Sequence, residues 1–500
     1  MSLFDYFEVS MPLLSITSGL IFIVILNYII SSINRVQKIP PGPWGLPLVG
    51  YLPFINDDSY LFFDRLAKKY GPVFSLRLGQ HDVVVICDWE HLKLAFADES
   101  LLARPLSTFK PGDVPSFMEM SGDIWREHRR LSLHILRDVG FGKSAMENLI
   151  TKEINQFLPT LEGRNVDFIK KVQPSVANII SSFLFGKVSV YSDPLKIQLD
   201  TNIENAAKLF KFAGLQAFVP WLIKTLAFFG LSNFKQFKSY MEAAETVIQK
   251  HVDDHVAKDK DSHEIVDYID GYLQEHERRK IKGEDDNMFN LHILRRNATV
   301  FFGAGSETIT STLSWGMMFL AARPEYQEKI RDEISEVIGY ERDPNYTDRN
   351  QMPFTMAFLY EVQRTGSVAA TNLLRRALND TKIGKFFIPK EATIIFNLWS
   401  IHREEKLWPD PERFDPNRFL TDNGTKAFKP PYLVPFSSGK RNCPGESLAN
   451  VELFLYTVSI LQRYRIKPEK IDSDLLSEAV YGIARRPKHL PPLTFEKFKP

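Results

Sequence analysis

Apolar residues recur along this chain at two spacings, and the helical spacing dominates. Between residues 120 and 340 most apolar positions follow a period near 3.6, which predicts α-helices. Shorter runs rich in β-branched residues, Val73 to Leu78 and Val83 to Ile86, predict strands. No internal repeat and no obvious linker divides residues 51–500. The pattern therefore predicts one large, mainly α domain with small β-sheets.

The longest uncharged apolar run is at the N-terminus. No charged residue lies between Glu8 and Arg35, and Met11 to Ile30 is almost wholly apolar. About 20 helical residues at roughly 1.5 Å each span a bilayer core of about 30 Å. Acidic residues precede the run and Arg35 and Lys38 follow it, so the rest of the chain should face the cytosol. A cleaved signal peptide is the alternative, but the run is long and no basic segment precedes it.

A proline-rich stretch, Ile39 to Pro47, follows the apolar run. Proline fixes φ and disfavours helix at the residue before it, so we expect a stiff, extended connector. The expected organisation is a membrane anchor at residues 1–34, with its transmembrane part at about 11–30, a hinge at 35–50 and the main domain at 51–500.

A second apolar stretch runs from Asn297 to Ala322 and contains one charged residue, Glu307. It could be a further membrane span, but Gly, Ser and Thr fill its middle and a lone carboxylate is costly in lipid. We therefore predict a long helix through the centre of the protein. Asp285 and Asp286 lie near its expected start, where acids suit the helix dipole, and Pro324 should end it.

Composition narrows the classes of function. Apolar residues make up 44% and charged residues 25% of the 500 residues, as in globular proteins. A net charge of +1 argues against nucleic acid as the main partner. Two cysteines exclude a disulfide framework and suit a reducing compartment.

Cys443 lies in a setting that differs from that of Cys87. Glycines at 439 and 445 would let the backbone approach a flat ligand closely. The apolar run Leu448 to Leu461 predicts a helix directly after the cysteine, whose N–H groups would favour the thiolate. Cys87, within a β-rich run, is interpreted as a small buried hydrophobe.

Four motifs together carry a family resemblance. The pattern Phe436-x-x-Gly439-x-Arg441-x-Cys443-x-Gly445 resembles the haem-binding signature of the cytochrome P450 superfamily. Further matches follow the family order and are Ala304-Gly-Ser-Glu-Thr308, Glu361-Val-Gln-Arg364 and Pro416-Asn-Arg-Phe419. The resemblance covers nearly the whole chain and is strongest to the drug- and steroid-metabolising microsomal branch of animals.

The resemblance implies haem b (iron protoporphyrin IX) as cofactor, with Cys443 as the iron ligand and Ala304, Phe436 and Gly445 against the ring. A thiolate ligand pushes electron density onto iron and favours O–O cleavage. Glu307 and Thr308 place an acid beside a hydroxyl and are the expected catalytic residues for proton delivery. The alternative is a Thr bonded back to its own helix and a solvated Glu.

A nucleotide site is the main rival interpretation. Gly303-Ala-Gly305 resembles the start of a dinucleotide-binding turn, but Thr308 stands where the third glycine belongs. Gly439-Lys440 is followed by Arg441 and not by the Ser or Thr of a phosphate loop. We therefore expect electrons to come from another protein.

Buried haem propionates need cationic partners. The family resemblance assigns this role to Trp125 and Arg129, which are four residues apart, and to Arg375 and Arg441. The chain has Leu374-Arg375 where the branch usually has Pro-His.

Glu361 and Arg364 are three residues apart and should share a helix face. The resemblance adds Arg418 and gives the trio a structural role around the haem, whereas a surface salt bridge is the alternative.

Further basic residues are expected on the electron-receiving surface, where the family docks NADPH-cytochrome P450 reductase and in some cases cytochrome b5. They are Arg126, His128, Arg130, Arg137, Lys143 and Lys440.

The aromatic segment Leu209 to Phe237 should touch the lipid interface and roof a cavity for lipophilic substrates. By resemblance the cavity also draws on Phe117, Phe301, Ala369 to Thr371 and Val480.

The expected function is that of a haem-thiolate monooxygenase in the endoplasmic-reticulum membrane, single-pass, with a cytosolic catalytic domain. It would insert one oxygen atom of O2 into a small lipophilic substrate. Two alternatives stay open, namely a haem-thiolate isomerase or dehydratase that does not use O2, and a non-catalytic haem-binding protein.

Overall fold

The computed structural model describes residues 38–55, 58–105, 115–210, 218–257, 265–284, 288–468 and 478–499, together with residues 19, 22–23 and 26–30. The chain forms two compact units. The first comprises residues 1–105 and 373–397, and the second comprises residues 106–372 and 398–500.

The first unit is built around a four-stranded sheet with the strand order β1-β2-β7-β4. Its described elements are η1 (Leu52–Phe54), α2 (Ser59–Tyr70), β1 (Val73–Leu78), β2 (His81–Ile86), α3 (Trp89–Ala97), η2 (Glu99–Leu101), β4 (Arg375–Arg376), β5 (Thr381–Ile383), β6 (Phe386–Ile388) and β7 (Thr393–Phe396). β1 and β2 pair antiparallel, as do β4 and β7, whereas β2 and β7 run parallel with Val83 opposite Thr393. The branched side chains of β2 and β7 are buried, which explains their β-branched composition.

The proline-rich stretch packs along the edge of this sheet. The hydroxyl of Ser75 in β1 donates to the carbonyl of Pro40, and its backbone N–H donates to that of Pro41 at 2.9 Å. Gly42 has no room for a side chain, because an added Cβ would lie 1.6 Å from the Ser75 carbonyl oxygen. Residues 40–42 therefore belong to the first unit through direct contact with β1.

The second unit is mainly α. Its described helices are α4 (Gly122–Asp138), α5 (Ser144–Phe157), η4 (Leu158–Leu161), α6 (Phe168–Phe185), α7 (Pro194–Lys208), α9 (Pro220–Phe228), α10 (Phe234–Ala257), α11 (Tyr268–Lys282), α12 (Leu291–Ala322), α13 (Pro324–Val337), η5 (Tyr346–Gln351), α14 (Pro353–Gly366), α15 (Leu398–Ile401), η6 (Pro416–Phe419), η7 (Asp422–Gly424), η8 (Gly439–Arg441) and α16 (Glu446–Arg463).

Short strands of the second unit form small antiparallel sheets. They are β3 (Gly163–Val166), β8 (Leu420–Thr421), β9 (Lys426–Ala427), β10 (Tyr464–Pro468), β11 (Ala479–Tyr481), β12 (Arg485–Pro487) and β13 (Leu493–Lys497). β10, β13 and β3 form one sheet, while β11 pairs with β12 and β8 with β9. A mainly α fold with small sheets, as predicted, is confirmed.

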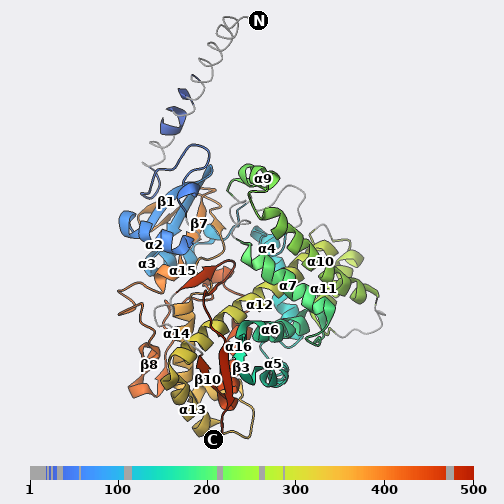
Figure 1. Ribbon diagram of the computed structural model, residues 1–500. Helices are drawn as coiled ribbons and strands as arrows, with labels where there is room; N and C mark the ends of the chain where they lie inside the picture. The colour runs from blue at the N-terminus through green and yellow to red at the C-terminus, as the bar shows by residue number, and fades with distance from the viewer. Residues whose placement is uncertain are drawn as a thin grey trace, which may run out of the picture. The chain divides into compact units, whose positions relative to one another are not determined.

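The long helix α12 forms the centre of the second unit and packs against α6, α7, α10, α14 and α16 (Figure 1). It is predicted from the apolar run, which begins at Asn297, and the helix itself begins at Leu291, where Asn290 caps it by accepting from the Ile293 N–H at 3.0 Å. The predicted acids at 285 and 286 lie outside the described residues. The helix ends at Ala322, before Pro324 begins α13.

In the part of the chain that the structure describes, no helix is long and apolar enough to cross a bilayer. Most of the predicted span, Met11 to Ile30, lies outside the described residues. The membrane anchor therefore stays a prediction.

Candidate active site

The Cys443 thiol lies in a tight loop between η8 and α16. The Cys443 N–H donates to the Phe436 carbonyl at 2.9 Å, and the Asn442 N–H donates to that of Gly439 at 3.0 Å. Ser437 and Gly439 have φ of 61° and 73°, so the loop needs left-handed backbone at two places. The predicted position of the cysteine, just before a helix, is confirmed by the start of α16 at Glu446.

Burial and nearby hydrogen-bond donors change the pKa of the Cys443 thiol in opposite directions. Burial raises the pKa of the Cys443 thiol, while a backbone bond from Gly445 and the positive charge of Arg129 lower it. A Cβ added to Gly445 would come within 3.8 Å of Sγ, so glycine leaves the sulfur accessible on that side. A single soft sulfur with N–H donors is the ligand type that iron takes in thiolate sites.

Two arginines and a tryptophan surround the same loop. Arg129 in α4 donates from Nη2 to the carbonyl and to the side-chain oxygen of Asn442, at 2.9 and 2.7 Å. The guanidinium of Arg441 lies 3.6 Å from the ring centroid of Trp125, one turn before Arg129. Its Nη2 donates to the carbonyl of Met120 at 2.6 Å. These cations beside a thiol fit a ligand that carries both a metal and carboxylates, as haem does.

Arg375 lies in β4 of the first unit and is 2% exposed. Its guanidinium lies 5.5 Å from the ring centroid of Phe396 in β7. This position does not test its predicted contact with a propionate, which stays a prediction.

Glu307 and Thr308 follow one another in the middle of α12. The Glu307 carboxyl is 5% exposed and has neither a hydrogen bond nor an ion pair within the described part of the chain. Burial raises its pKa to about 7, against the opposing charges of Arg486 and Lys208. The Thr308 hydroxyl donates to the Ala304 carbonyl at 2.8 Å. The alternative of a threonine bonded to its own helix beside a solvated glutamate therefore holds for Thr308 but not for Glu307, which is buried.

The glycines beside Ala304 have a packing role that the sequence did not reveal. A Cβ on Gly305 would lie 3.1 Å from Cγ1 of Ile180 in α6, closer than ordinary contact. One on Gly303 would lie 3.5 Å from Ile203 in α7. Small residues here allow α12 to approach α6 and α7, in addition to any space they leave for a ligand.

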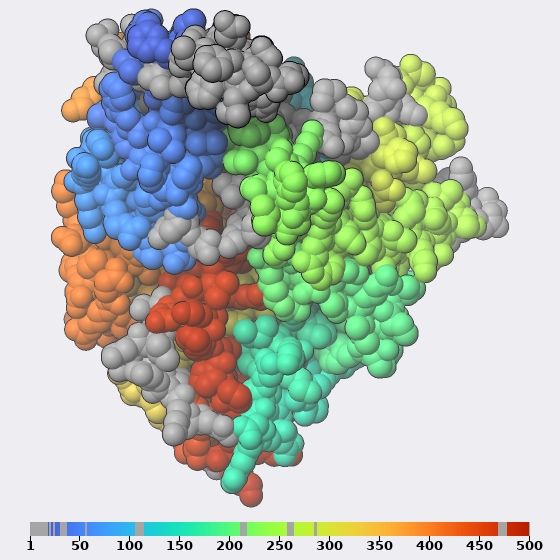
Figure 2. Space-filling model, turned by 45° about the horizontal axis from the view of Figure 1, so that its top comes forward, coloured from blue at the N-terminus to red at the C-terminus, as the bar shows by residue number. Residues whose placement is uncertain are grey.

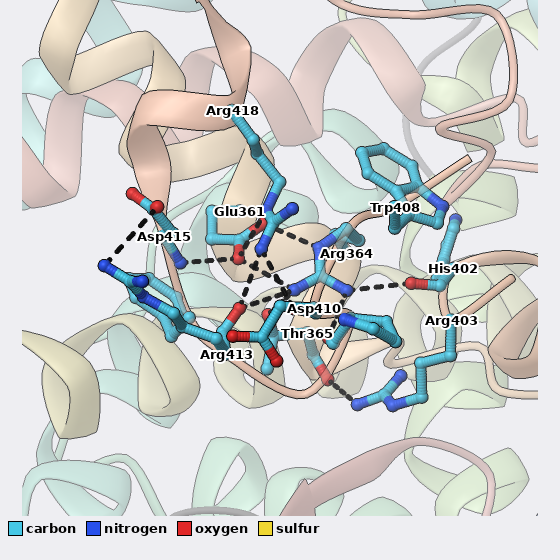
Figure 3. Close-up of polar contacts among 12 residues, drawn as sticks. Glu361, Arg364, Thr365, His402, Arg403, Trp408, Asp410, Arg413, Asp415 and Arg418 are labelled. Atoms are coloured by element: carbon cyan, nitrogen blue, oxygen red, sulfur yellow. Dashed lines mark hydrogen bonds and ion pairs between the residues drawn. The ribbon is translucent and has the colours of Figure 1, made fainter. Parts of the chain in front are cut away.

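Glu361, Arg364 and Arg418 form one buried cluster (Figure 3). Arg364 donates from Nε and Nη2 to the two carboxylate oxygens of Glu361, at 2.7 and 2.8 Å, and both side chains are 0% exposed. Arg418 donates from Nε to Glu361 Oε1 at 3.2 Å, and the Asp415 N–H donates to the same oxygen at 2.7 Å. The pair is therefore not a surface salt bridge.

His402 connects this cluster with the segment that leads into the cysteine loop, because its carbonyl accepts from Arg364 Nη1 at 2.8 Å and its ring contacts Val434. It was not identified from the sequence. Its Nε2 accepts from the Val434 N–H at 3.1 Å, so the other ring nitrogen carries the hydrogen that faces Ser367 Oγ at 3.0 Å. Burial and the charges of Arg364 and Arg403 lower the pKa of His402, which keeps the ring neutral. A lone histidine in a polar stretch gives no sequence signal for this role.

The predicted basic surface on and after α4 needs one correction. Arg126, Arg130, Arg137, Lys143 and Lys440 are exposed. His128 is instead fully buried, stacked on Phe289 with ring centroids 4.0 Å apart. Burial lowers its pKa to about 4, so it is neutral and contributes no charge to a surface.

The structure brings together some of the predicted cavity residues. Phe117 and Phe301 stack with ring centroids 5.0 Å apart. Thr371 Oγ1 lies 2.7 Å from the hydroxyl of Tyr481, the neighbour of Val480. Phe212 and the rest of residues 211–217 lie outside the described residues.

Aromatic side chains of α9 and the turn after it are exposed. The exposed fractions are 51% for Trp221, 77% for Phe228 and 67% for Phe229, and Leu231 follows at 71%. α9 contributes to the green surface in Figure 2. Clustered exposure of this size is unusual for a surface that meets only water.

A cysteine loop ahead of a helix, with Arg129 acting on the thiol and Arg441 in the same loop, fits the class of haem-thiolate proteins. The chain belongs to the cytochrome P450 family, whose model matches residues 40–491. It is similar to cytochrome P450 2J1 of Oryctolagus cuniculus, at 32% identity over 91% of each chain. Cytochrome P450 2J2 of Homo sapiens is 33% identical over 87% of each chain. Cytochrome P450 18a1 of Drosophila melanogaster is 31% identical over 91% of this chain and 86% of its own.

Family membership establishes the activity at the level of class. The protein is a monooxygenase that binds haem (iron protoporphyrin IX) and inserts one oxygen atom of O2 into a small lipophilic substrate. Its electrons come from a redox partner. An isomerase, a dehydratase or a non-catalytic haem protein is not favoured.

Proposed function

We propose that this chain is a microsomal P450 of the endoplasmic-reticulum membrane that oxidises lipophilic molecules with electrons from NADPH-cytochrome P450 reductase. Cytochrome b5 would be a second donor. The observation that carries the proposal is the Cys443 loop, in which the sulfur meets the Gly445 N–H at the start of α16.

In this proposal the Cys443 sulfur would hold the iron, and Phe436 and Gly445 would contact the haem. Arg129 and Arg441, with Trp125 and Arg375, would hold the propionates through charge-assisted bonds. When bound, the haem supplies the centre at which O2 is reduced and its O–O bond cleaved. Arg129 also fixes the loop, because it holds both oxygens of Asn442, the residue before the cysteine.

Glu307 and Thr308 supply the protons. A carboxyl with a pKa of about 7 is partly protonated at neutral pH, so Glu307 can both hold and release a proton there. The Thr308 hydroxyl has its own hydrogen engaged with Ala304, but its oxygen retains lone pairs that can accept. Glu361, Arg364 and Arg418 are assigned a structural role and take no part in proton transfer.

Exposed basic residues steer the electron donor. Arg126, Arg130 and Arg137 on α4, with Lys143 and Lys440, give a cationic surface for an acidic flavoprotein. We expect the association rate to fall as salt is raised, because such steering is screened.

The membrane contacts are proposed from sequence and exposure. Residues 1–34 would anchor the chain once, residues 35–50 would connect, and residues 51–500 would form the cytosolic catalytic domain. The exposed Trp221, Phe228 and Phe229 would lie in the lipid interface and admit lipophilic substrates.

The decisive experiment compares the two cysteines. Cys443→Ala should abolish the haem-thiolate band of the reduced CO complex, because the methyl group of alanine cannot bind iron in place of the sulfur. Cys87→Ala is the control, since Cys87 is buried after β2 with its sulfur 4.0 Å from the Phe63 carbonyl. An unchanged band in Cys443→Ala would reject the proposal. In the wild type, product formation that needs both NADPH and the reductase distinguishes this proposal from one in which the chain does not use O2.

A further inference from the structure

A chain of buried hydrogen bonds links three helices to the turn that carries Phe117. The Phe117 N–H donates to Oδ1 of Asn297 in α12 at 2.8 Å. Nδ2 of Asn297 donates to the Tyr268 hydroxyl of α11 at 3.4 Å, and that hydroxyl lies 2.9 Å from Ser132 Oγ of α4. Phe117, Asn297, Tyr268 and Ser132 are each at most 2% exposed. Neither the proton route nor the haem contacts proposed above involve these hydrogen bonds.

The chemistry of the groups fixes the direction of the bonds. A backbone N–H can only donate, so the amide oxygen of Asn297 must face Phe117 and its NH2 must face Tyr268. Burial raises the pKa of Tyr268 to about 12, which keeps its hydroxyl neutral. Asn297 therefore satisfies a donor and an acceptor at once, which no apolar side chain of its size can do.

The turn held by Asn297 is also tied to the cysteine loop. The Glu119 and Met120 N–H groups both donate to the Ser116 carbonyl, which closes residues 116–120 into one turn. Asn297 holds the second residue of this turn, while Arg441 donates to its last carbonyl, that of Met120, at 2.6 Å. The turn is thus fixed at one end by α12 and at the other by the loop of Cys443.

The side chain that this turn positions faces the reactive stretch of α12. Phe117 stacks on Phe301, and Phe301 meets Tyr268 edge to face at 5.2 Å. Asn297, Phe301, Ala304 and Thr308 follow at spacings of four, three and four residues, so they share one face of the helix. An aromatic pair on this face lies in line with the residues proposed for catalysis.

We propose that Asn297 is a positioning residue that sets the shape of the substrate cavity by holding Phe117 against Phe301. Asn297 itself contacts no substrate. It acts through the backbone of residue 117, with Tyr268 and Ser132 holding its amide in orientation. The proposal rests on the proposed function, because it assigns the Phe117–Phe301 pair to the wall of that cavity.

Binding of two iron ligands tests the cavity without requiring turnover. Imidazole and 1-phenylimidazole bind haem iron through the same nitrogen, but only the second places an aromatic group against the cavity wall. Their dissociation constants are measured from the Soret shift of the full-length holoenzyme. Asn297→Leu should lower the preference for 1-phenylimidazole by about tenfold and leave imidazole within about twofold, since only the wall moves.

Two further variants separate the acceptor from simple loss of stability. Asn297→Asp keeps an oxygen for the Phe117 N–H, and the Tyr268 hydroxyl can turn to donate to the other oxygen, so the preference should stay within about twofold. Thr299→Val is the matched control, because Thr299 is 1% exposed on α12 and, among the described residues, its hydroxyl donates only to the Arg295 carbonyl of its own helix, at 2.8 Å. It should leave both constants within about twofold. If Asn297→Leu does not fold, Asn297→Ser, too short to reach Phe117, replaces it.

Amide hydrogen exchange at residue 117 gives a second readout. The rate should rise by about tenfold or more in Asn297→Leu and Asn297→Ser and stay unchanged in Asn297→Asp. Unchanged exchange in Asn297→Leu, or an equal loss of preference in Thr299→Val, would overturn the inference. Failure of the wild type to oxidise substrates with reductase and NADPH would instead contradict the proposed function. It would leave this inference untouched, because neither the ligand preference nor the hydrogen exchange depends on turnover.

Discussion

Glu361 and Glu307, two of the glutamates that the second unit buries, have opposite surroundings. Glu361 accepts four bonds, two from Arg364 and one each from Arg418 and the Asp415 N–H (Figure 3). Glu307 is almost as buried but accepts no hydrogen bond within the described residues, and its pKa is raised to about 7. The surroundings, and not the residue type, thus decide whether a buried carboxyl is paired by cations or is left without a partner and has its pKa raised.

The two glutamates should also affect the stability of the folded protein differently. Removing a cation that pairs a buried carboxylate strands the charge and strongly destabilises the folded state. A carboxyl without a partner weakens the folded state when it ionises, yet this same property allows it to take up and release protons. Removing the cation beside Glu361 should therefore lower the free energy of unfolding, whereas removing the ionisable carboxyl of Glu307 should raise it.

Arg364→Met should give the largest effect. It leaves the Glu361 carboxylate, which is 0% exposed, without its main cation and should lower the free energy of unfolding by about 3–5 kcal/mol. Urea unfolding and haem retention measure the change. Combining it with Glu361→Gln should recover part of the loss, because the stranded charge is removed. Equal instability of the single and double variants would contradict the importance of the charge.

A matched control lies in the same region. Glu412 pairs with Arg403 at 3.3 Å, but its side chain is 66% exposed. Glu412→Gln should change the free energy of unfolding by less than about 0.5 kcal/mol, as expected for a surface pair.

Glu307→Gln should have the next largest effect, in the opposite direction. The folded protein raises the pKa of Glu307, so its contribution to stability is complete below the ordinary pKa of about 4 and is lost as the pH rises to about 7. Glutamine does not ionise, so the variant should be more stable than the wild type by up to about 3 kcal/mol at pH 8 and by little near pH 4. Urea unfolding at the two pH values measures this.

Turnover gives Glu307 a second readout. If this carboxyl delivers protons, wild-type product formation falls as the pH rises through about 7. Glu307→Gln should be slow and should lack this dependence. A variant that is stabilised but keeps the wild-type rate and profile would exclude Glu307 from proton delivery.

Arg418→Ala should have the smallest of these effects. Glu361 would keep Arg364 and the Asp415 N–H, so we expect a loss of about 1–2 kcal/mol in the free energy of unfolding. Arg413→Ala is the control, because Arg413 is 68% exposed and meets Asp415 only at 3.8 Å. A loss as large as that of Arg364→Met would show that the two arginines contribute equally.

Spacing along the chain predicts those features that depend on neighbours in sequence. The apolar period indicates α12 and α16, the β-branched runs indicate β1 and β2, and the three-residue spacing of Glu361 and Arg364 places them together. The residues around Cys443 carry a motif, so the loop and its two arginines are anticipated by resemblance. These patterns are local or shared by a family.

Contacts between segments that are distant in the sequence could not be predicted from spacing or motifs. A charge-rich helix predicts a solvated face, yet His128 is buried because Phe289, far along the chain, covers it. His402 and Asn297 act through backbone groups of residues 434 and 117, which any side chain can offer. Since a backbone N–H has no sequence signature, neither role is visible before folding.

The close approach at Gly305 has a consequence for redesigning this protein. A Cβ at position 305 would lie 3.1 Å from Ile180 on a different helix, so a side chain there requires Ile180 to shift. The two positions therefore behave as one site during laboratory evolution. Libraries that vary residue 305 alone should return mostly glycine, whereas libraries that vary both positions together should reveal new solutions with a smaller residue at 180.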